Sequence, residues 1–466
     1  MRSSILRQSA LDAFPAELLD LILSENRPNY DFFEVEKGST RRWRKPAGWK
    51  QYLNAVYTLA QLRAVSKSWY NFITPLLYNK FVLPTHPEDE FKRIGNALAL
   101  HPDLVHHLVI RGLGGDGADH QASKRLCACL SMCTNVRNLE IVDPKRILWH
   151  GSEGKGLKIF RSLPPTMPLK SLVLRFLDEP DATVFATSTI LVGLGDLVKG
   201  LVELEIHKRV WSEMGDPRQV REKLKLPAAF PNLERLYVSG GLDMNAMQLG
   251  RLFSRIVRVE NPTAQQPQDD VAMGVLDEGK PKPTAAGKTT SPLRDLTLCK
   301  YTYERITRPE VITNILTTNN LGMGLTTLRI RLRPTWNGTY QLETFPYIII
   351  KHCPALTTLL YMIPCPEHFL KSVPATISTL GILISPAQPR PPYPWLAPQV
   401  AEQLSGFICS ADALIEYICR RGSKKGLKNL IVGWDKALRY QRQREPEILE
   451  EACWVAGMTF STDPGF

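Results

Sequence analysis

A short apolar motif recurs along most of this 466-residue chain at a nearly constant interval. The motif is an apolar residue, two variable residues, leucine, one variable residue and a second apolar residue. Its ten copies are VHHLVI at residue 105, VRNLEI at 136, LKSLVL at 169, LVELEI at 201, LERLYV at 233, LRDLTL at 293, LTTLRI at 325, LTTLLY at 356, ISTLGI at 377 and LKNLIV at 427. Six of the first seven intervals lie within one residue of 32. Such self-similarity indicates stacked units that bury their apolar faces against one another.

Each unit is predicted to contain one strand and one helix. The alternation of apolar and variable residues at the end of each motif is typical of a strand. Helical patterns lie between the motifs, at residues 91–100, 122–133, 183–199, 245–258 and 309–318. Because a helix crosses over between successive strands, the strands are expected to be parallel and the fold α/β.

Three intervals depart from the period, and they are 60, 21 and 50 residues long. The interval of 60 contains the polar residues 261–291, which have few large apolar side chains and predict a disordered loop. The interval of 50 contains a proline-rich loop at 385–398. The last segment, 436–466, predicts a helix that covers the open end of the array.

Two amphipathic segments precede the repeats, at residues 11–23 and 59–83. Each has one apolar stripe at helical spacing, and Pro15 stands early in the first, where its missing N–H costs little. We therefore divide the chain into a helical domain at 1–83, with an insertion at 24–54, and a solenoid at 84–466.

Three blocks of the helical domain resemble an F-box, most closely its fungal form. They are Leu11-x-x-Phe14-Pro15-x-Glu17-Leu18-Leu19-x-x-Ile22-Leu23, Leu62-Arg63-x-Val65-Ser66-Lys67-x-Trp69 and Pro75-Leu76-Leu77-Tyr78. The repeats resemble degenerate leucine-rich repeats that lack a regular Asn or Cys after the strand. This resemblance implies an irregular horseshoe of parallel strands with outer helices.

The resemblance also implies a function. F-box families dock their helices onto the small adaptor of a cullin–RING ubiquitin ligase, so the chain would be a non-catalytic substrate-recognition subunit of an SCF-type ligase. The adaptor contacts implied are Leu11, Phe14, Pro15, Leu18, Leu19, Ile22, Leu62, Val65 and Trp69. The cullin scaffold would be an indirect partner. A protein-binding scaffold outside any ligase is the alternative.

The strand residues that alternate with the apolar ones are expected to face away from the core and to hold a protein substrate. The expected face is acidic near Glu203 and Glu205, and basic near Arg329 and Arg331. Tyr237, Arg329 and Arg331 are expected to act as anchors, because tyrosine and arginine dominate interface energetics.

Two other partners are weighed and set aside. The loop Gly112-x-Gly114-Gly115-x-Gly117 matches a dinucleotide fingerprint, but Asp119 and His120 stand where small apolar residues should follow, so no cofactor is expected. The formal charge of +12 permits nucleic-acid binding. However, the basic residues are mostly scattered, and the densest cluster, at 41–45, also suits a solvated loop. We expect no nucleic-acid partner.

The nine cysteines, an odd number, indicate free thiols in a reducing compartment, which predicts a cytoplasmic or nuclear location. Cys127, Cys129 and Cys133 lie beside leucines on a predicted helix and are interpreted as small core residues. With no CxxC pair, no metal site is expected. No apolar run approaches 18 residues, so no membrane partner is expected either.

Overall fold

The computed structural model describes residues 47–84, 88–111, 120–143, 158–176, 183–208, 229–239, 246–259, 289–302, 309–333, 345–362, 367–384, 409–421, 426–434 and 445–462. The helix predicted at 11–23, most of the loop predicted at 261–291 and the proline-rich loop at 385–398 lie outside these residues. The chain divides into two compact units between Arg175 and Phe176.

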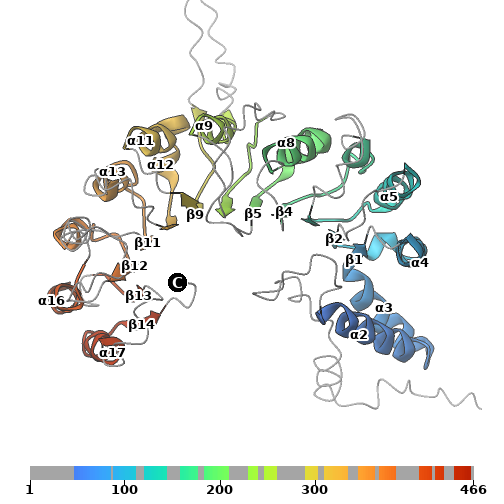
Figure 1. Cartoon of the computed structure of the whole chain (residues 1–466), viewed down its shortest axis with the longest axis horizontal. Helices are drawn as coiled ribbons and strands as arrows, with labels where there is room; N and C mark the ends of the chain where they lie inside the picture. Colours follow the sequence, from blue (N-terminus) through green and yellow to red (C-terminus); the bar gives the residue numbers. More distant parts are fainter. Residues whose placement is uncertain are drawn as a thin grey trace, which may run out of the picture. The chain divides into compact units, whose positions relative to one another are not determined.

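The first unit contains a helical hairpin followed by four parallel strands. Its elements are α2 (Ala47–Arg63), α3 (Lys67–Asn79), β1 (Lys80–Pro84), α4 (Glu88–Leu98), η2 (Pro102–Leu104), β2 (His107–Arg111), α5 (His120–Met132), β3 (Asn138–Val142) and β4 (Ser171–Phe176). The strands pair in the order β1-β2-β3-β4, and the register aligns Leu108, Leu139 and Leu172. These leucines are buried, and α4 and α5 lie on one side of the strands (Figure 1).

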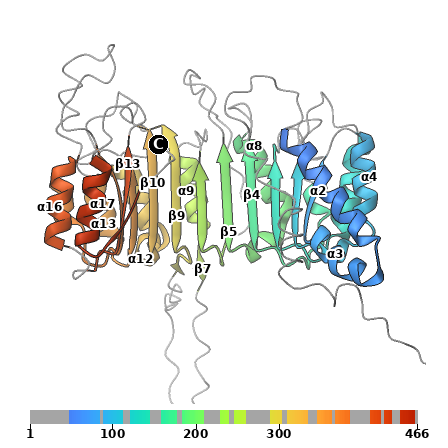
Figure 2. The same ribbon diagram turned by 90° about the horizontal axis from the view of Figure 1, so that it is seen from below.

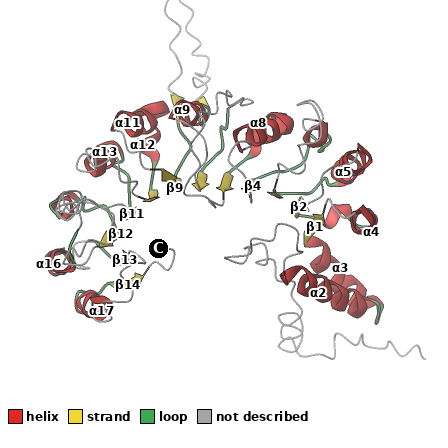
Figure 3. Ribbon diagram, viewed as in Figure 1, coloured by secondary structure: helices red, strands yellow, loops and turns green. Residues whose placement is uncertain are grey.

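The second unit continues the same pattern through eight parallel strands. Its elements are α8 (Thr183–Leu194), η3 (Gly195–Gly200), β5 (Glu203–Lys208), β6 (Arg235–Ser239), α9 (Ala246–Ser254), β7 (Arg258–Val259), β8 (Thr289–Thr290), β9 (Asp295–Thr302), α11 (Pro309–Thr317), η4 (Thr318–Asn320), α12 (Leu321–Gly324), β10 (Thr327–Arg333), α13 (Phe345–His352), β11 (Thr358–Met362), α14 (Phe369–Ser372), β12 (Thr379–Ile384), α16 (Ala411–Arg421), β13 (Asn429–Trp434), α17 (Glu445–Val455) and β14 (Thr459–Thr462). The strands are ordered β5-β6-β9-β10-β11-β12-β13-β14 in the sheet, and Figure 2 shows the arrows of β5, β9, β10 and β13 pointing the same way. Within this unit the described helices lie on one side of the sheet (Figure 3).

All ten predicted strands are confirmed, and each begins two residues after the first residue of its motif. The parallel pairing is confirmed as well. Two further strands, β1 and β14, were assigned by the sequence to helical segments. The helical pattern at 59–83 includes the apolar run Phe81-Val82-Leu83, which forms β1 instead. The helix instead stops at Asn79, because Lys80 has an extended backbone with φ −116° and ψ 110°.

The same hydrogen-bond pattern links neighbouring repeats at the start of most strands. The carbonyl of His106 accepts hydrogen bonds from two N–H groups of the next unit, those of Arg137 at 2.8 Å and Asn138 at 3.0 Å. The carbonyl of Ser378 does the same with Lys428 and Asn429 at 2.8 and 3.0 Å. The same pattern precedes β3, β4, β6, β9, β10, β11, β12 and β13, so each of these strands starts at the level of its preceding neighbour.

Asparagine side chains also connect consecutive units, but they lie before the strands rather than after them. The Asn135 amide donates to the carbonyl of Asp103 at 2.7 Å, and the Asn232 amide donates to the carbonyl of Lys199 at 2.8 Å. Both residues immediately precede a motif. They satisfy backbone carbonyls of the preceding repeat. In regular leucine-rich repeats, an Asn or Cys after the strand is expected to do this.

The structure describes the ends of two segments that the sequence predicts to interrupt the fold, at 24–54 and 261–291. Helix α2 begins at Ala47, inside the insertion predicted at 24–54. The short strands β7 and β8 pair antiparallel, with Arg258 opposite Thr290 and Val259 opposite Thr289. This ribbon brings the two ends of the intervening polar segment together. Over the described ranges, no helix combines the length and hydropathy that crossing a bilayer requires.

Two glycines offer a matched test of the packing between successive repeats. A Cβ atom at Gly322 would lie 2.4 Å from the backbone oxygen of His352, whereas nothing lies within 4 Å of one at Gly250. Gly322→Ala is expected to lower the free energy of unfolding by about 1–3 kcal/mol, because backbone must shift to admit the methyl group. Gly250→Ala in α9 should raise it by up to about 1 kcal/mol.

Urea unfolding of both variants, followed by circular dichroism, measures this difference. Equal effects of the two substitutions would show that the backbone of α13 does not approach Gly322 closely.

Candidate functional site

The strands β5, β6, β9 and β10 bring most of the predicted substrate-binding residues together. We call the side of the second unit's sheet that faces away from its helices the open face. The register places Glu203, Arg235, Asp295 and Thr327 in one row across these strands, and Glu205, Tyr237, Thr297 and Arg329 in the next. Arg331 is opposite Cys299 in β9, but its side chain lies outside the described part.

Ion pairs connect neighbouring strands of the open face. The Arg235 Nε atom is 3.2 Å from Glu203 Oε1. The Arg329 Nη1 atom is 3.0 Å from Asp295 Oδ2 and also donates to Thr297 Oγ1 at 3.4 Å. The first row therefore alternates in charge, whereas the second row runs from the acidic Glu205 to the basic Arg329, in the order that the sequence predicts. Partly exposed pairs of this kind stabilise little but orient their side chains.

Tyr237 is held in place by a histidine on the neighbouring strand. The His207 Nε2 atom is 2.7 Å from Glu205 Oε2, and the His207 ring stacks on the Tyr237 ring with 4.5 Å between centroids. All three side chains are half-buried. A rigid aromatic side chain beside polar groups suits recognition of a protein or peptide, because little rotamer entropy is lost on binding.

The open face becomes uncharged towards the C-terminal strands. Thr358, Thr379, Asn429 and Thr459 form one row, and the Asn429 amide donates to Thr379 Oγ1 at 3.0 Å. The next row is apolar and contains Leu360, Gly381 and Ile431. A Cβ atom at Gly381 would lie 2.6 Å from Leu360 Cδ2, so the leucine side chain lies directly over the glycine.

In the first unit, several residues predicted to face a partner are buried. Val109, Arg111 and Val142 are only 0%, 4% and 1% exposed. The sequence placed them with the solvent-facing strand residues because they alternate with the core leucines. Their burial removes them from any candidate surface.

Glu140 is buried in the same unit beside Arg175 and His107. Its Oε1 atom accepts from Arg175 Nε at 2.6 Å, and its Oε2 atom lies 3.6 Å from His107 Nε2. Burial alone would raise the pKa of Glu140. Interactions with His107, Arg175 and Lys80 outweigh this effect and lower the pKa to about 2. The carboxylate is therefore a structural ion bound to its neighbours rather than a proton donor.

The helical hairpin divides the three described adaptor-contact residues between its interior and its surface. Trp69 is buried in a cluster with Leu59 and Ile73, and Leu62 packs against this cluster. Val65, in the turn between α2 and α3, is 66% exposed. The remaining predicted contacts, Leu11, Phe14, Pro15, Leu18, Leu19 and Ile22, lie outside the described residues.

Several exposed residues on the hairpin were not predicted as contacts. Among them, Phe72 and Leu76 lie four positions apart on α3, so they share one side of the helix. Both belong to the apolar stripe of the segment 59–83. When apolar residues lie on both the buried and the exposed side of a helix, the sequence pattern alone does not show which side is buried. The buried positions Trp69, Ile73 and Thr74 define the true interior side.

Aromatic contacts fix the hairpin to the first repeat. The Tyr78 hydroxyl donates to the Ala97 carbonyl at 2.9 Å, and its ring stacks on Phe81 at 5.7 Å between centroids. The Tyr70 hydroxyl lies 2.9 Å from His101 Nε2. α3 is therefore held against both α4 and β1, and the side of the hairpin that carries Phe72 and Leu76 has a defined orientation within the first unit.

The described residues offer little for covalent or metal chemistry. No group of three His, Cys, Asp or Glu side chains in the described part is arranged to hold a metal ion. The described cysteines are free thiols, and burial raises the pKa values of Cys133, Cys353 and Cys409 to about 12. These three thiols remain protonated at neutral pH. The glycine-rich loop at 112–117 lies outside the described residues.

Comparison with solved structures finds a structural likeness. No protein-family model matches the chain, and no curated protein matches it. Among solved structures, the leucine-rich-repeat-containing protein LegL7 from Legionella pneumophila is 13% identical, with 83% of this chain and 91% of that chain covered and a TM-score of 0.29. The parallel-strand repeat is established by the strand register of this chain.

Glu140 provides a pH test of the first unit. Because its folded-state pKa lies below the ordinary value of 4.5, the carboxylate stabilises the fold above about pH 4.5, and this contribution is lost as the pH falls through about 2. Glu140→Gln should lower the free energy of unfolding by about 3 kcal/mol at pH 7.

Urea unfolding at pH 7, 4 and 2.5 measures this dependence, and the cost of Glu140→Gln should shrink at each step. Glu203→Gln, which alters a more exposed pair, should cost much less at pH 7. A cost for Glu140→Gln that does not change with pH would show that Glu140 contributes by packing rather than charge.

Proposed function

We propose that this protein is the substrate-recognition subunit of a cullin–RING ubiquitin ligase of the SCF type. In this proposal the N-terminal helices bind the ligase adaptor and the open face binds a protein substrate. The observation that carries it is the hairpin α2–α3, which is anchored to the first repeat yet leaves apolar side chains exposed.

The adaptor would contact the exposed side of the hairpin. Val65, Phe72 and Leu76 are available for burial, whereas Trp69 supports the hairpin from inside. Burying one side chain of this size contributes roughly 1.5–3 kcal/mol, so a few such contacts provide much of the affinity of a stable complex. Trp69 and Leu62 therefore act mainly by shaping the surface, and Val65 by contacting the adaptor.

The substrate would bind to the open face of the second unit. Tyr237 offers a rigid aromatic anchor, and the alternating pairs Glu203–Arg235 and Asp295–Arg329 offer both signs of charge at close spacing. A protein or peptide with alternating charges would match this pattern. The protein would then act by raising the effective concentration of the substrate near the ubiquitin-conjugating enzyme. It would act in the cytoplasm or nucleus.

A protein-binding scaffold outside any ligase is the second candidate. The open face favours it independently, because its polar and aromatic side chains offer binding chemistry whether or not the hairpin meets an adaptor. In that case the exposed residues of α3 would serve another protein contact.

A pull-down of purified ligase adaptor by the full chain separates these two candidates. Val65→Asp introduces a charge at an exposed turn, so the fold should survive, whereas an unpaired carboxylate buried in an interface costs several kcal/mol. We expect Val65→Asp to weaken adaptor binding by about tenfold or more.

Leu100→Asp is the matched control, since Leu100 is 65% exposed and Val65 is 66% exposed, but Leu100 follows α4. It should bind the adaptor within about twofold of the wild type. Failure of the wild-type chain to retain the adaptor would refute the ligase proposal and leave the scaffold.

A further inference from the structure

The outer helices of the first unit carry cationic residues in consecutive repeats. Lys92 and Arg93 lie on α4, Lys124 and Arg125 on α5, and Lys158 and Arg161 in the helical residues 158–161. We call these six residues the basic ridge. Lys92 and Lys124 each take the fifth position of their helix, and they are separated by 32 residues, which is the repeat interval.

Contacts between the helices show that these cations lie on adjacent elements. A Cβ atom at Gly95 in α4 would lie 3.2 Å from the sulfur of Cys129 in α5. The Cys127 thiol of α5 is in turn 4.0 Å from the carbonyl of Lys158. Residues separated by more than thirty positions in the sequence therefore lie on three neighbouring helices.

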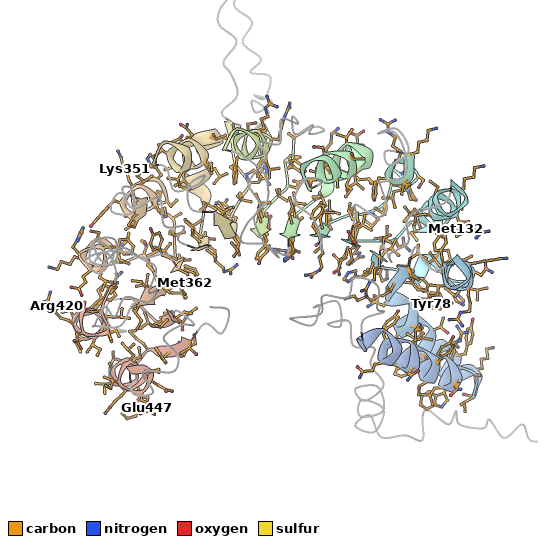
Figure 4. All side chains as sticks on the ribbon, viewed as in Figure 1. Tyr78, Met132, Lys351, Met362, Arg420 and Glu447 are labelled. Atoms are coloured by element: carbon orange, nitrogen blue, oxygen red, sulfur yellow. The ribbon has the colours of Figure 1, made fainter. Side chains whose placement is uncertain are left out.

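The cations face away from the sheet. Phe91, Leu126 and Phe160 are buried on the inner side of the three helices at 1%, 3% and 1% exposure. Arg125 is half-buried, and the other five ridge residues are exposed. Figure 4 shows side chains of the outer helices extending away from the strands of this unit.

We propose that the basic ridge binds the phosphate backbone of a nucleic acid. Neighbouring packed helices lie roughly 8–10 Å apart, so the ridge presents cations within about one Debye length of each other across three repeats. At one end, Tyr57 is 47% exposed, and the Arg93 guanidinium lies 5.6 Å from its ring centroid. An aromatic ring beside a cation is the pair that stacks a base and holds its phosphate in single-stranded complexes.

The neighbouring side chains favour a nucleic acid over an acidic protein. The other exposed positions on α4 and α5 include Asn96, Ala128 and Ser131, and no described residue of these helices is an exposed large apolar side chain. Protein interfaces depend on a few buried apolar or aromatic anchors. Nucleic-acid binding instead gains its affinity from counterion release by lysine and arginine, which the ridge supplies. Acidic residues Glu88, Asp89 and Glu90 open α4, and their side chains lie outside the described part.

Fluorescence anisotropy with the full chain tests this proposal. The probes are a fluorescein-labelled 20-nucleotide oligo-dT and a labelled 20-base-pair duplex, each titrated at 50, 100 and 200 mM NaCl. The test variant carries Lys92→Gln, Lys124→Gln, Lys158→Gln and Arg161→Gln. The control variant carries Arg255→Gln, Lys351→Gln, Lys371→Gln and Lys428→Gln, which remove the same charge from exposed positions of the second unit.

The wild type is expected to bind at 50 mM salt and to lose affinity steeply as salt rises. The ridge variant should bind at least about tenfold more weakly, and its logarithmic salt slope should fall by about 3, at roughly 0.7 per lost contact with a single strand. The control variant should stay within about threefold of the wild type. Preference for one probe identifies the single-stranded or the duplex form.

Three outcomes would overturn the proposal. They are no binding by the wild type at 50 mM salt, equal losses in the ridge and control variants, and complete displacement of the probe by polyglutamate at equal charge concentration. The third outcome would assign the ridge to an acidic protein. Because the ridge variant leaves Val65, Phe72 and Leu76 unchanged, none of these outcomes depends on adaptor binding.

Discussion

One backbone hydrogen-bond pattern, repeated at the start of eight described strands, determines how successive repeats of this protein stack. A single carbonyl, such as that of His106, accepts from two successive N–H groups of the following unit. This geometry fixes the level of each strand relative to its neighbour, so the leucines at Leu108, Leu139 and Leu172 fall into one buried row. Because successive side chains of a strand point to opposite faces, the residues on either side of each leucine lie on the opposite side of the sheet.

The sequence predicted the repeated part of the fold well because its signal is periodic. Each motif leucine occupies a buried register position, and a buried row tolerates little substitution, so the pattern is readable without a structure. Strands β1 and β14 were missed for a physical reason. They lie at the ends of the array, each pairing with one described neighbour, so their residues need not follow the full motif. The exposed Thr459, Ser461 and Thr462 of β14 illustrate this freedom.

The candidate site was predictable in position but not in detail. Alternation along a strand correctly placed Glu203, Tyr237 and Arg329 on the same side of the sheet. The sequence could not show that Arg235 and Asp295 separate them with opposite charges, because pairing depends on which strand is the neighbour and on side-chain reach. The same limit applies to the cations of α4 and α5. They are distant in the sequence and so look scattered, yet the repeat interval places them on adjacent helices.

The small ribbon of β7 and β8 has a consequence for how the chain tolerates change. Its antiparallel pairing places residue 259 opposite residue 289, so the two ends of the intervening segment lie next to each other. The closing entropy of such a segment grows only slowly with its length. This position is therefore suited to insertion, because a folded reporter domain whose own termini lie close together can be placed between β7 and β8 without altering the pairing of β6 with β9.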